Sequence, residues 1–293
     1  MKSTVHMAIL LSLYKFFTKQ FTGTNISRNP LARKIINKLN SKLKLEYVLI
    51  NGKKLFLDES DSLFLSLSSH ETMQVSLSKK EIKKGDVVLD IGAHIGYYTI
   101  IFSELVGSTG KVYAFEPLPK NFQLLKKTVE TNNLTNVEIF QNIVSDKNET
   151  LDFYTSKLDS VGNRMYNSDE AASKIEINSI SIDEFLKNKS NKVDFVKMDI
   201  QGAEVLAIDG MKETLQNNKK LKIIQEWWPE AIKKYDRIPD SHLNFLEKLG
   251  FIFYVVDETY DKLTPITVSK LMKTYPNDNL EDVNLFCVNE KSI

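Results

Sequence analysis

The sequence predicts an α/β fold, in which a mostly parallel sheet of seven strands carries helices on both faces and ends in an antiparallel edge. Two observations carry this prediction. From residue 85 onward, short apolar runs alternate with segments of helical periodicity. The last two apolar runs, 251–256 and 283–288, have no predicted helix between them, which is typical of an antiparallel finish at one edge.

The seven predicted strands share apolar, β-branched or aromatic residues between polar or Gly-bearing turns. They are expected at 87–91, 111–115, 137–143, 193–198, 221–227, 251–256 and 283–288. Helices are expected at 97–106, 120–132, 203–216 and 241–249. Residues 147–192 are an insertion with extra strands expected at 151–154 and 175–177 and a loop at 162–173, and a second long loop is expected at 258–282.

Two regions precede this main domain, which is expected to span residues 85–293. Residues 1–45 hold nine Lys or Arg and no Asp or Glu, and are expected to form a basic, partly amphipathic helical arm. The arm fits a helix docked on the body or peripheral association with an anionic membrane. Its uncharged part is too short to span a bilayer, so the chain is expected to be cytoplasmic. In residues 46–84, loose apolar–polar alternation predicts a hairpin with an Asn51-Gly52 turn, and a helical pattern predicts a helix over 71–83. Both are expected to pack on the core.

Composition excludes several classes of site. The only cysteine, Cys287, can form neither an internal disulfide nor a Cys-based zinc site, and it is expected to be a small buried side chain. The body carries no basic stripe of the kind that nucleic-acid enzymes show, so no nucleic-acid partner is expected. No dense group of acids or histidines demands a metal, and no metal site is predicted.

The first strand and its turn carry the main functional pattern. Asp90 lies at the strand's carboxyl end, and Gly92, Ala93, Gly96 and Tyr97 follow in the turn and the start of the next helix. Glycine lets backbone approach a ligand closely, and the free N–H groups of a helix start suit a carboxylate. The spacing Asp-x-Gly-x-x-x-Gly is not the dinucleotide fingerprint Gly-x-Gly-x-x-Gly. A carboxylate at Asp90 would favour an ammonium or a sulfonium, as in S-adenosylmethionine.

The ends of the second and third strands complete the predicted cofactor site. Glu116 lies 26 residues after Asp90, where an acidic side chain can accept both hydroxyls of a ribose. Asn142 can bond the edge of an adenine and Ile143 can cover its face. The alternative for Asn142 is that it caps the turn.

These runs resemble the FkbM-type family of S-adenosylmethionine-dependent methyltransferases. The resemblance rests on Gly85–Thr99, on Phe115-Glu116-Pro117 and on Lys197-Met198-Asp199-Ile200-Gln201-Gly202-Ala203-Glu204, and it covers about residues 46–290. It implies a Rossmann-like class I methyltransferase fold with S-adenosylmethionine as cofactor. It also implies methyl transfer to a hydroxyl of a sugar, a glycan or another small molecule.

Two positions depart from the family's pattern. His94 stands where the family commonly has Asn, and Gln201 stands where it commonly has Glu. His94 can donate to the methionine carboxylate or lie near the transferred methyl group, or it can simply fill the Asn position of the turn. Gln201 weakens any mechanism that needs an acid there.

The ends of the fourth and fifth strands supply the candidates for chemistry. A hydroxyl acceptor benefits from alignment with the donor and from a base at hydrogen-bond distance. Asp199 and Glu226 lie at these strand ends and, with His94, are the candidate catalytic residues. Asp199 can alternatively cap the next helix. The candidate substrate contacts are Lys197, one pleat before Asp199, Glu204 in the next helix, and the rings of Tyr98 and Trp228, which can stack on a sugar.

Two other functions stay open at this point. His94 and Gln201 are compatible with a catalytically silent protein that binds the cofactor without turnover. A nicotinamide-dependent oxidoreductase is the other alternative, and the Gly spacing speaks against it. The run after strand four, Asp199-Ile200-Gln201-Gly202, lacks the two prolines and the aromatic residue of enzymes that methylate base amines.

Overall fold

The computed structural model describes residues 46–58, 65, 70–156, 165, 171–189, 192–275 and 282–289. The basic arm at 1–45, with its predicted helix and membrane association, lies outside the described residues, as does most of the loop predicted at 162–173. Within the described ranges, no helix combines the length and the apolar character needed to cross a bilayer.

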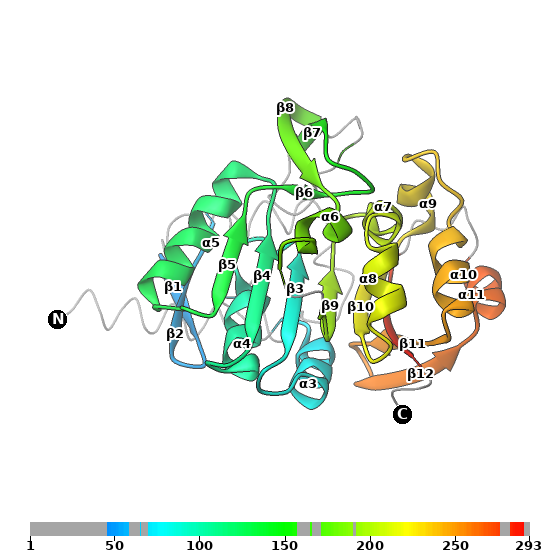
Figure 1. Cartoon of the computed structure of the whole chain (residues 1–293), viewed down its shortest axis with the longest axis horizontal. Coiled ribbons are helices and arrows are strands. Elements are labelled where there is room, and N and C mark those ends of the chain that lie inside the picture. Colours follow the sequence, from blue (N-terminus) through cyan, green and yellow to red (C-terminus); the bar gives the residue numbers. More distant parts are fainter. Residues whose placement is uncertain are drawn as a thin grey trace, which may run out of the picture.

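In the described part of the chain, eight strands form the central sheet, in the order β12-β11-β13-β10-β9-β3-β4-β5 (Figure 1). They are β3 (Val87–Ile91), β4 (Lys111–Phe115), β5 (Val137–Phe140), β9 (Phe195–Met198), β10 (Lys222–Trp227), β11 (Phe251–Asp257), β12 (Lys262–Ile266) and β13 (Val283–Asn289). The strands from β5 to β10 in this order run parallel, whereas β13, β11 and β12 pair antiparallel. A strand of this sheet occurs in each of the seven predicted segments, the third one shortened, and the antiparallel edge is confirmed. β12 is an eighth strand within the segment 258–282 that was predicted to be a loop.

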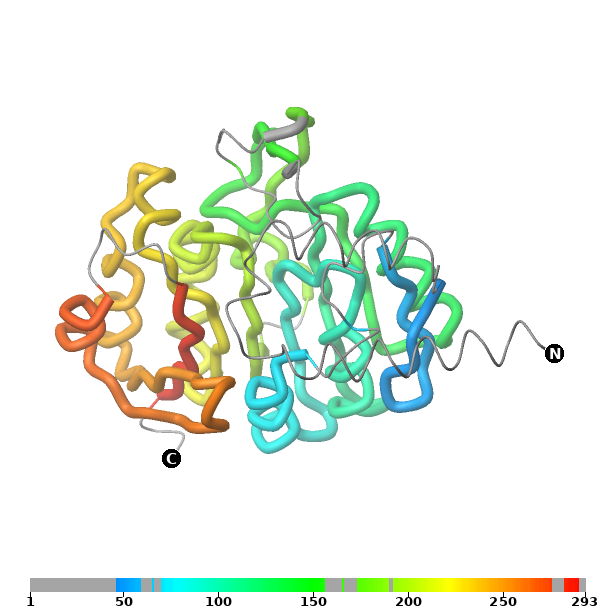
Figure 2. The backbone as a smooth tube through the Cα atoms, turned by 180° about the vertical axis from the view of Figure 1, so that it is seen from behind, coloured from blue at the N-terminus to red at the C-terminus, as the bar shows by residue number. Residues whose placement is uncertain are grey.

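The parallel strands β3, β4, β9 and β10 are buried on both faces, whereas the edge strand β5 is partly exposed. Side chains of a strand alternate between the two sides of the sheet. Leu89, Val196 and Ile223 point into one core, and their chain neighbours Val88, Phe195 and Ile224 point into the other. The first core is covered by α6 (Ile182–Leu186), α7 (Glu204–Asp209), α8 (Lys212–Asn217), α10 (Ser241–Lys248) and α11 (Val268–Thr274). The second is covered by α3 (Thr72–Glu81) and α4 (Tyr97–Val106), which lie in front of the sheet in Figure 2.

The predicted helix at 203–216 is interrupted, and its two parts are α7 and α8. Asp183 accepts hydrogen bonds from the backbone N–H groups of Glu213 (2.9 Å) and Thr214 (2.8 Å), so a new helix starts there. Gly210 lies between the helices, and a Cβ on it would come 2.0 Å from the carbonyl oxygen of Ser145. The break therefore depends on contacts with distant segments.

The predicted third strand at 137–143 is also interrupted, at 141–142. β5 ends at Phe140, and β6 (Ile143–Val144) pairs with β8 (Ala171–Ile180) instead. Among the described residues, β6, β8 and β7 (Thr150–Ser156) form a separate sheet of three strands, beside the end to which the parallel strands point (Figure 1). The extra strands predicted in the insertion are parts of β7 and β8.

The hairpin predicted before the core consists of β1 (Tyr47–Ile50) and β2 (Lys53–Phe56), which pair around Asn51-Gly52. β2 lies next to α5 (Pro119–Thr131). The first turn of α3 is capped from far along the chain. The carboxylate of Glu258, just after β11, accepts the backbone N–H groups of Met73 (2.9 Å) and Gln74 (3.0 Å). An acid is favourable at a helix N-terminus, so this contact holds the start of α3 against the sheet.

The sequence did not predict α6, α9 (Pro229–Lys233) or α11. These helices have five, five and seven residues, which is too short to show a helical period. Cys287 is fully buried in β13, as predicted, and Gln225 donates a hydrogen bond to its Sγ at 3.4 Å.

His242 on α10 makes stability sensitive to acid. Its side chain is buried, and among the described residues neither ring nitrogen has a hydrogen-bond partner. Burial lowers the pKa of His242 from 6.5 to about 3, against the opposing charge of Asp240. Between pH 6.5 and about pH 3, the unfolded chain therefore binds a proton at His242, whereas the folded chain does not. The contribution of the buried neutral His242 to the free energy of unfolding is complete above pH 6.5 and is lost as the pH falls towards 3.

We expect His242→Leu to flatten the acid limb of the stability profile. Between about pH 6.5 and pH 4.5, the wild type should lose about 2 kcal/mol more of its free energy of unfolding than the variant, measured by urea denaturation. Lys248→Gln changes an exposed residue of the same helix and should follow the wild type. Identical pH slopes for the wild type and His242→Leu would contradict this assignment.

Candidate active site

The candidate site lies where the strand order changes direction. β3 pairs with β4 on one side and with β9 on the other, so the crossover connections diverge from β3. A crevice for ligands opens at the carboxyl ends of the strands at such a point. The cleft found there has an empty volume of about 740 Å³, which includes the part open to solvent.

Six of the predicted site residues line this cleft. They are Gly92, His94, Glu116, Asn142, Ile143 and Asp199, which come from the ends of four neighbouring strands. Gly92 has φ +84°, and a Cβ there would come 2.3 Å from the carbonyl oxygen of Asp199. A glycine is therefore required where the turn after β3 passes the end of β9.

Glu116 is the central acid of the cleft. Its carboxylate accepts hydrogen bonds from the backbone N–H groups of His94 (2.9 Å) and Leu118 (3.0 Å), and from the Asn121 amide at 3.4 Å. Burial raises the pKa of Glu116 to about 7 despite these hydrogen bonds. The carboxylate is thus held in place from two strand ends and can accept further hydrogen bonds from a ligand.

The end of β5 provides an amide and an apolar surface. Asn142 donates a hydrogen bond to the carbonyl oxygen of Asn178 at 3.0 Å, which ties this strand end to β8 rather than capping the turn. Ile143 is buried beside Phe153 of β7 in a small apolar cluster, and both line the cleft. The insertion therefore forms part of the cleft wall.

Four predicted cofactor residues do not line this cleft. Asp90 is buried beneath the turn and accepts a hydrogen bond from Thr99 Oγ1 at 2.6 Å; burial raises its pKa to about 6. Asp90 thus contacts the first turn of α4 through Oδ2, and its role toward a cationic ligand group stays a prediction. Ala93 packs against Ala114 and Leu125, and Gly96 faces α5. Tyr97 donates its hydroxyl to the carbonyl oxygen of His70 at 2.9 Å.

Asp199 forms the polar edge of the cleft at the end of β9. Its carboxylate lies 3.4 Å from Lys197 Nζ and accepts a hydrogen bond from the Gln201 amide at 3.4 Å. Burial opposes its ionisation, but Lys197 and Gln201 outweigh burial, and the pKa of Asp199 is lowered. Desolvation disfavours the charge of Lys197, but the neighbouring carboxylates raise its pKa above the ordinary value. Asp199 is therefore a stable carboxylate.

Glu226 and Glu204 lie behind this edge and do not line the cleft. Gln201 Nε2 donates to Glu226 at 3.3 Å, and burial with the charge of Asp199 raises the pKa of Glu226 well above its usual range. Glu204 is fully buried and accepts the backbone N–H of Ile200 at 2.8 Å, and burial raises its pKa to about 7. Both acids favour the protonated form more than a surface acid does.

The predicted aromatic contacts are also displaced from the cleft. Tyr98 is buried on α4, where it donates to Glu71 at 2.7 Å, and Lys197 Nζ lies 4.5 Å from its ring centroid. Its ring is thus engaged by a cation and is not placed to stack on a sugar. Trp228 lies at the start of α9, outside the cleft lining.

Several residues that line the cleft were not among the predicted site residues. They include Asn121, Phe153, Met165 and Tyr235. Phe153 and Met165 belong to the insertion, whose sequence has no period that places it at the strand ends. The sequence signal that could have identified Asn121 is its position, five residues after Glu116. Across the described ranges, no group of three or more His, Cys, Asp or Glu side chains is arranged to hold a metal ion.

Comparison with known families identifies the chain. The model of the Methyltransferase FkbM domain matches residues 90–253, which is more than half of the chain. The chain belongs to the FkbM methyltransferase family. Its fold is the Rossmann-like class I methyltransferase fold, and its cofactor is S-adenosylmethionine.

More distant similarities extend over part of the chain. A probable cobalt-precorrin-6B C(15)-methyltransferase (decarboxylating) of Saccharolobus solfataricus is 37% identical over 94 residues, which are 30% of this chain and 45% of that protein. A protein-L-isoaspartate O-methyltransferase of Fervidobacterium nodosum is 31% identical over 127 residues, which are 42% of this chain and 62% of that protein. The chain thus spans about half the length of these curated relatives. The solved precorrin-6y C5,15-methyltransferase of Geobacter metallireducens is 15% identical, with a TM-score of 0.43 over 76% of this chain and 90% of that chain.

The structure explains both departures from the FkbM pattern. His94 has φ +52°, in the left-handed region where Asn and His are enriched over most residues, so His can replace Asn in this turn. Gln201 has φ +58° and lies between Asp199 and Glu226. An acid at this position would add a further charge beside two carboxyl groups, whereas the amide donates to both.

The cleft fits the cofactor of the FkbM family. Asn142 and Ile143 would hold the adenine at the end of β5, and Glu116 would accept the ribose hydroxyls at the end of β4. The Gly92 turn would leave room for the methionine part beside β3. These residues lie along one cleft, in the order in which the three parts are joined in the cofactor.

The Glu116 assignment predicts a loss of cofactor affinity in Glu116→Gln. Calorimetry should show that Glu116→Gln binds S-adenosylmethionine about 10-fold or more weakly than the wild type does, because hydrogen bonds to a charged group contribute about 1.5–3 kcal/mol. The ionised carboxylate is the better acceptor and its pKa is about 7, so wild-type affinity should fall as the pH drops below 7. The variant should lack this dependence. Lys120→Gln, exposed on α5, is the control, and equal affinities in Glu116→Gln and the wild type would refute the assignment.

Proposed function

We propose that this FkbM methyltransferase methylates a hydroxyl group of a sugar, a glycan or another small polar molecule. The observation that carries the proposal is the polar edge of the cleft, where the Gln201 amide donates a hydrogen bond to Asp199 at the end of β9 and a second one to Glu226 behind the edge. This edge offers a carboxylate and an amide to the cleft, side by side. Such groups suit an acceptor with several hydroxyls better than an apolar one.

The residues of the cleft edge would position the acceptor. The bound cofactor supplies an activated methyl group on a sulfonium. Asp199 stays ionised near neutral pH, because Lys197 and Gln201 lower its pKa, and it can accept a hydrogen bond from the acceptor hydroxyl, whose oxygen becomes more positive as the methyl group is transferred. Gln201 keeps the Asp199 carboxylate in one orientation. The task of this edge is alignment and electrostatic stabilisation, which account for much of the rate enhancement in many enzymes.

The relatives include a probable cobalt-precorrin-6B C(15)-methyltransferase and a protein-L-isoaspartate O-methyltransferase, so they differ in the acceptor. Support for a hydroxyl acceptor comes instead from the polar edge and from the family resemblance of the three motifs. A catalytically silent protein that only binds the cofactor is the alternative, and it predicts binding without transfer. The two functions are separated by one assay.

Transfer from methyl-labelled S-adenosylmethionine to a panel of acceptors tests the proposal. The panel contains sugars, nucleotide sugars, phenols, amines, an isoaspartyl peptide and RNA. We expect label in a hydroxylated acceptor, in a product that resists alkali, because an ether survives conditions that hydrolyse a methyl ester. Label in an ester, on nitrogen or on carbon would contradict the proposal. Cofactor binding without label in any acceptor would select the silent alternative.

Asp199→Asn should lower kcat about 100-fold or more, since it removes a charge placed at the reacting groups. Its affinity for S-adenosylmethionine should remain measurable by calorimetry, which separates a loss of chemistry from a loss of folding. Asp261→Asn, an exposed acid in the turn between β11 and β12, is the matched control. An Asp199→Asn enzyme as fast as this control would remove Asp199 from the mechanism.

A further inference from the structure

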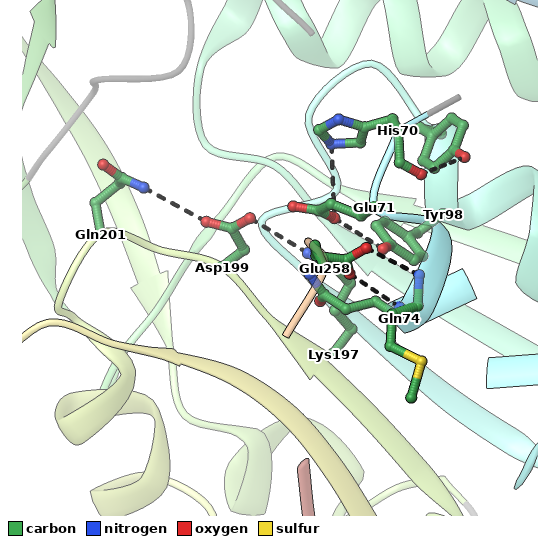
Figure 3. A network of polar contacts seen from close by, with 10 residues as sticks. His70, Glu71, Gln74, Tyr98, Lys197, Asp199, Gln201 and Glu258 are labelled. Carbon is green, nitrogen blue, oxygen red and sulfur yellow. Dashed lines mark hydrogen bonds and ion pairs between the residues drawn. The ribbon is translucent and has the colours of Figure 1, made fainter. Parts of the chain in front are cut away.

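A second polar network reaches the cleft edge from the N-terminal end of α3. His70 Nε2 lies 3.5 Å from Glu71 Oε2, and the same carboxylate oxygen accepts the Tyr98 hydroxyl at 2.7 Å. His70 and Glu71 precede the segment 90–253 that matches the family model. Figure 3 shows them on the opposite side of Asp199 from Gln201.

This network is continuous with Asp199. The Lys197 ammonium lies 4.5 Å from the Tyr98 ring centroid and 3.4 Å from Asp199 Oδ2. Asp199 in turn lines the cofactor cleft. The charge of His70 helps to lower the pKa of Asp199, and the charge of Glu71 helps to raise that of Lys197, so the two networks share one electrostatic field.

The backbone around His70 is held by several contacts. Its carbonyl oxygen accepts the Tyr97 hydroxyl at 2.9 Å, and its ring meets the Tyr97 ring edge-on at 5.3 Å between centroids. Glu71 adopts φ +45°, and the helix that follows it is capped by Glu258. The His70 side chain nevertheless keeps 26% of its surface exposed, so the imidazole is both positioned and accessible.

The carboxyl groups at the cleft edge and behind it are less suited to accept a proton. Asp199 is paired with Lys197, and its lowered pKa makes it a weak base. Glu204 is fully buried, and Glu226 favours its protonated form. An imidazole is the most frequent general base in enzymes.

We propose that His70 is the general base that takes the proton of the acceptor hydroxyl, with Glu71 as the positioning residue that orients and stabilises the imidazolium. The inference rests on the proposed hydroxyl acceptor. In this arrangement a carboxylate orients the base through one ring nitrogen, as the third group of a catalytic triad orients its base. Glu71 holds Nε2, which leaves Nδ1 to accept the proton. As the acceptor O–H bond breaks, an O–CH₃ bond forms, and the S–CH₃ bond breaks with its electron pair remaining on sulfur. The proton then passes from His70 to water.

The pH dependence of the reaction tests this role. The titratable groups around His70 are Glu71 beside it, Tyr97 and Tyr98 from α4, Lys197 and Asp199 from β9, and Glu258 after β11. The full-length protein is assayed with the hydroxylated acceptor found by the labelling screen, from about pH 5 to pH 9. S-adenosylmethionine is kept saturating at every pH, so that protonation of Glu116 does not enter kcat/KM for the acceptor. We expect His70→Gln to lower kcat by about 100-fold or more and to abolish the acid limb of the kcat/KM profile, with S-adenosylmethionine affinity retained.

Glu71→Gln is the second variant, and it keeps an oxygen to accept the Tyr98 hydroxyl. Without the neighbouring negative charge, the imidazolium is less stable, so the acid limb should move to lower pH. If Glu71 had a purely structural role, Glu71→Gln would lower the amount of active protein and leave the acid limb of the kcat/KM profile in place. This variant decides the question even if His70→Gln fails to fold. Lys79→Gln, exposed on α3, is the control that should match the wild type.

The outcomes separate the two proposals. A wild-type enzyme that methylates a hydroxyl while His70→Gln stays equally fast, or keeps its acid limb, would overturn only the role of His70. An unmoved acid limb in Glu71→Gln would show that the limb does not belong to an imidazole held by Glu71, and would overturn the pair as the base. A wild-type enzyme that methylates none of the hydroxylated acceptors would overturn the proposed function, and this inference with it.

Discussion

The close approach of two turns is the constraint on which the site depends. The carbonyl oxygen of Asp199 occupies the place that a Cβ of residue 92 would need, so the turn after β3 can pass the end of β9 only as glycine. That passage brings the N–H of His94 to Glu116 at the end of β4 and sets Asp199 at the margin of the same cleft. The cofactor anchor and the acceptor edge are thus placed by one backbone contact.

The second requirement is the control of negative charge. Asp199, Glu204 and Glu226 converge at the ends of β9 and β10, where burial makes repulsion between carboxylates costly. Lys197 and Gln201 reduce this cost in different ways. The ammonium keeps Asp199 ionised, whereas the amide donates to both Asp199 and Glu226 without adding charge. The result is one stable carboxylate at the cleft, with more weakly acidic groups behind it.

Most of the sheet, but only part of the site, could be predicted from the amino-acid sequence. Strands such as 87–91 could be predicted because apolar residues buried on both faces leave a strong local pattern. The break between α7 and α8 could not, since it depends on Asp183 and on Ser145, both distant in the chain. The spacing of Asp90, Gly92 and Glu116 predicted a nucleotide-like cofactor, yet it could not show that Asp90 turns inward to Thr99. Side-chain direction at a strand end is decided by packing.

By itself, the sequence determined the α/β class, the parallel order of strand and helix, the family and the cofactor, because these depend on local periodicity and on a short motif. Tertiary structure alone decided which acids face the cleft, how the insertion forms its wall, and how His70 and Glu71 come to lie beside Asp199. Those residues are more than a hundred positions apart along the chain. They are brought together by the capping of α3 by Glu258 and by the packing of α4 on β9, and no local pattern records such contacts.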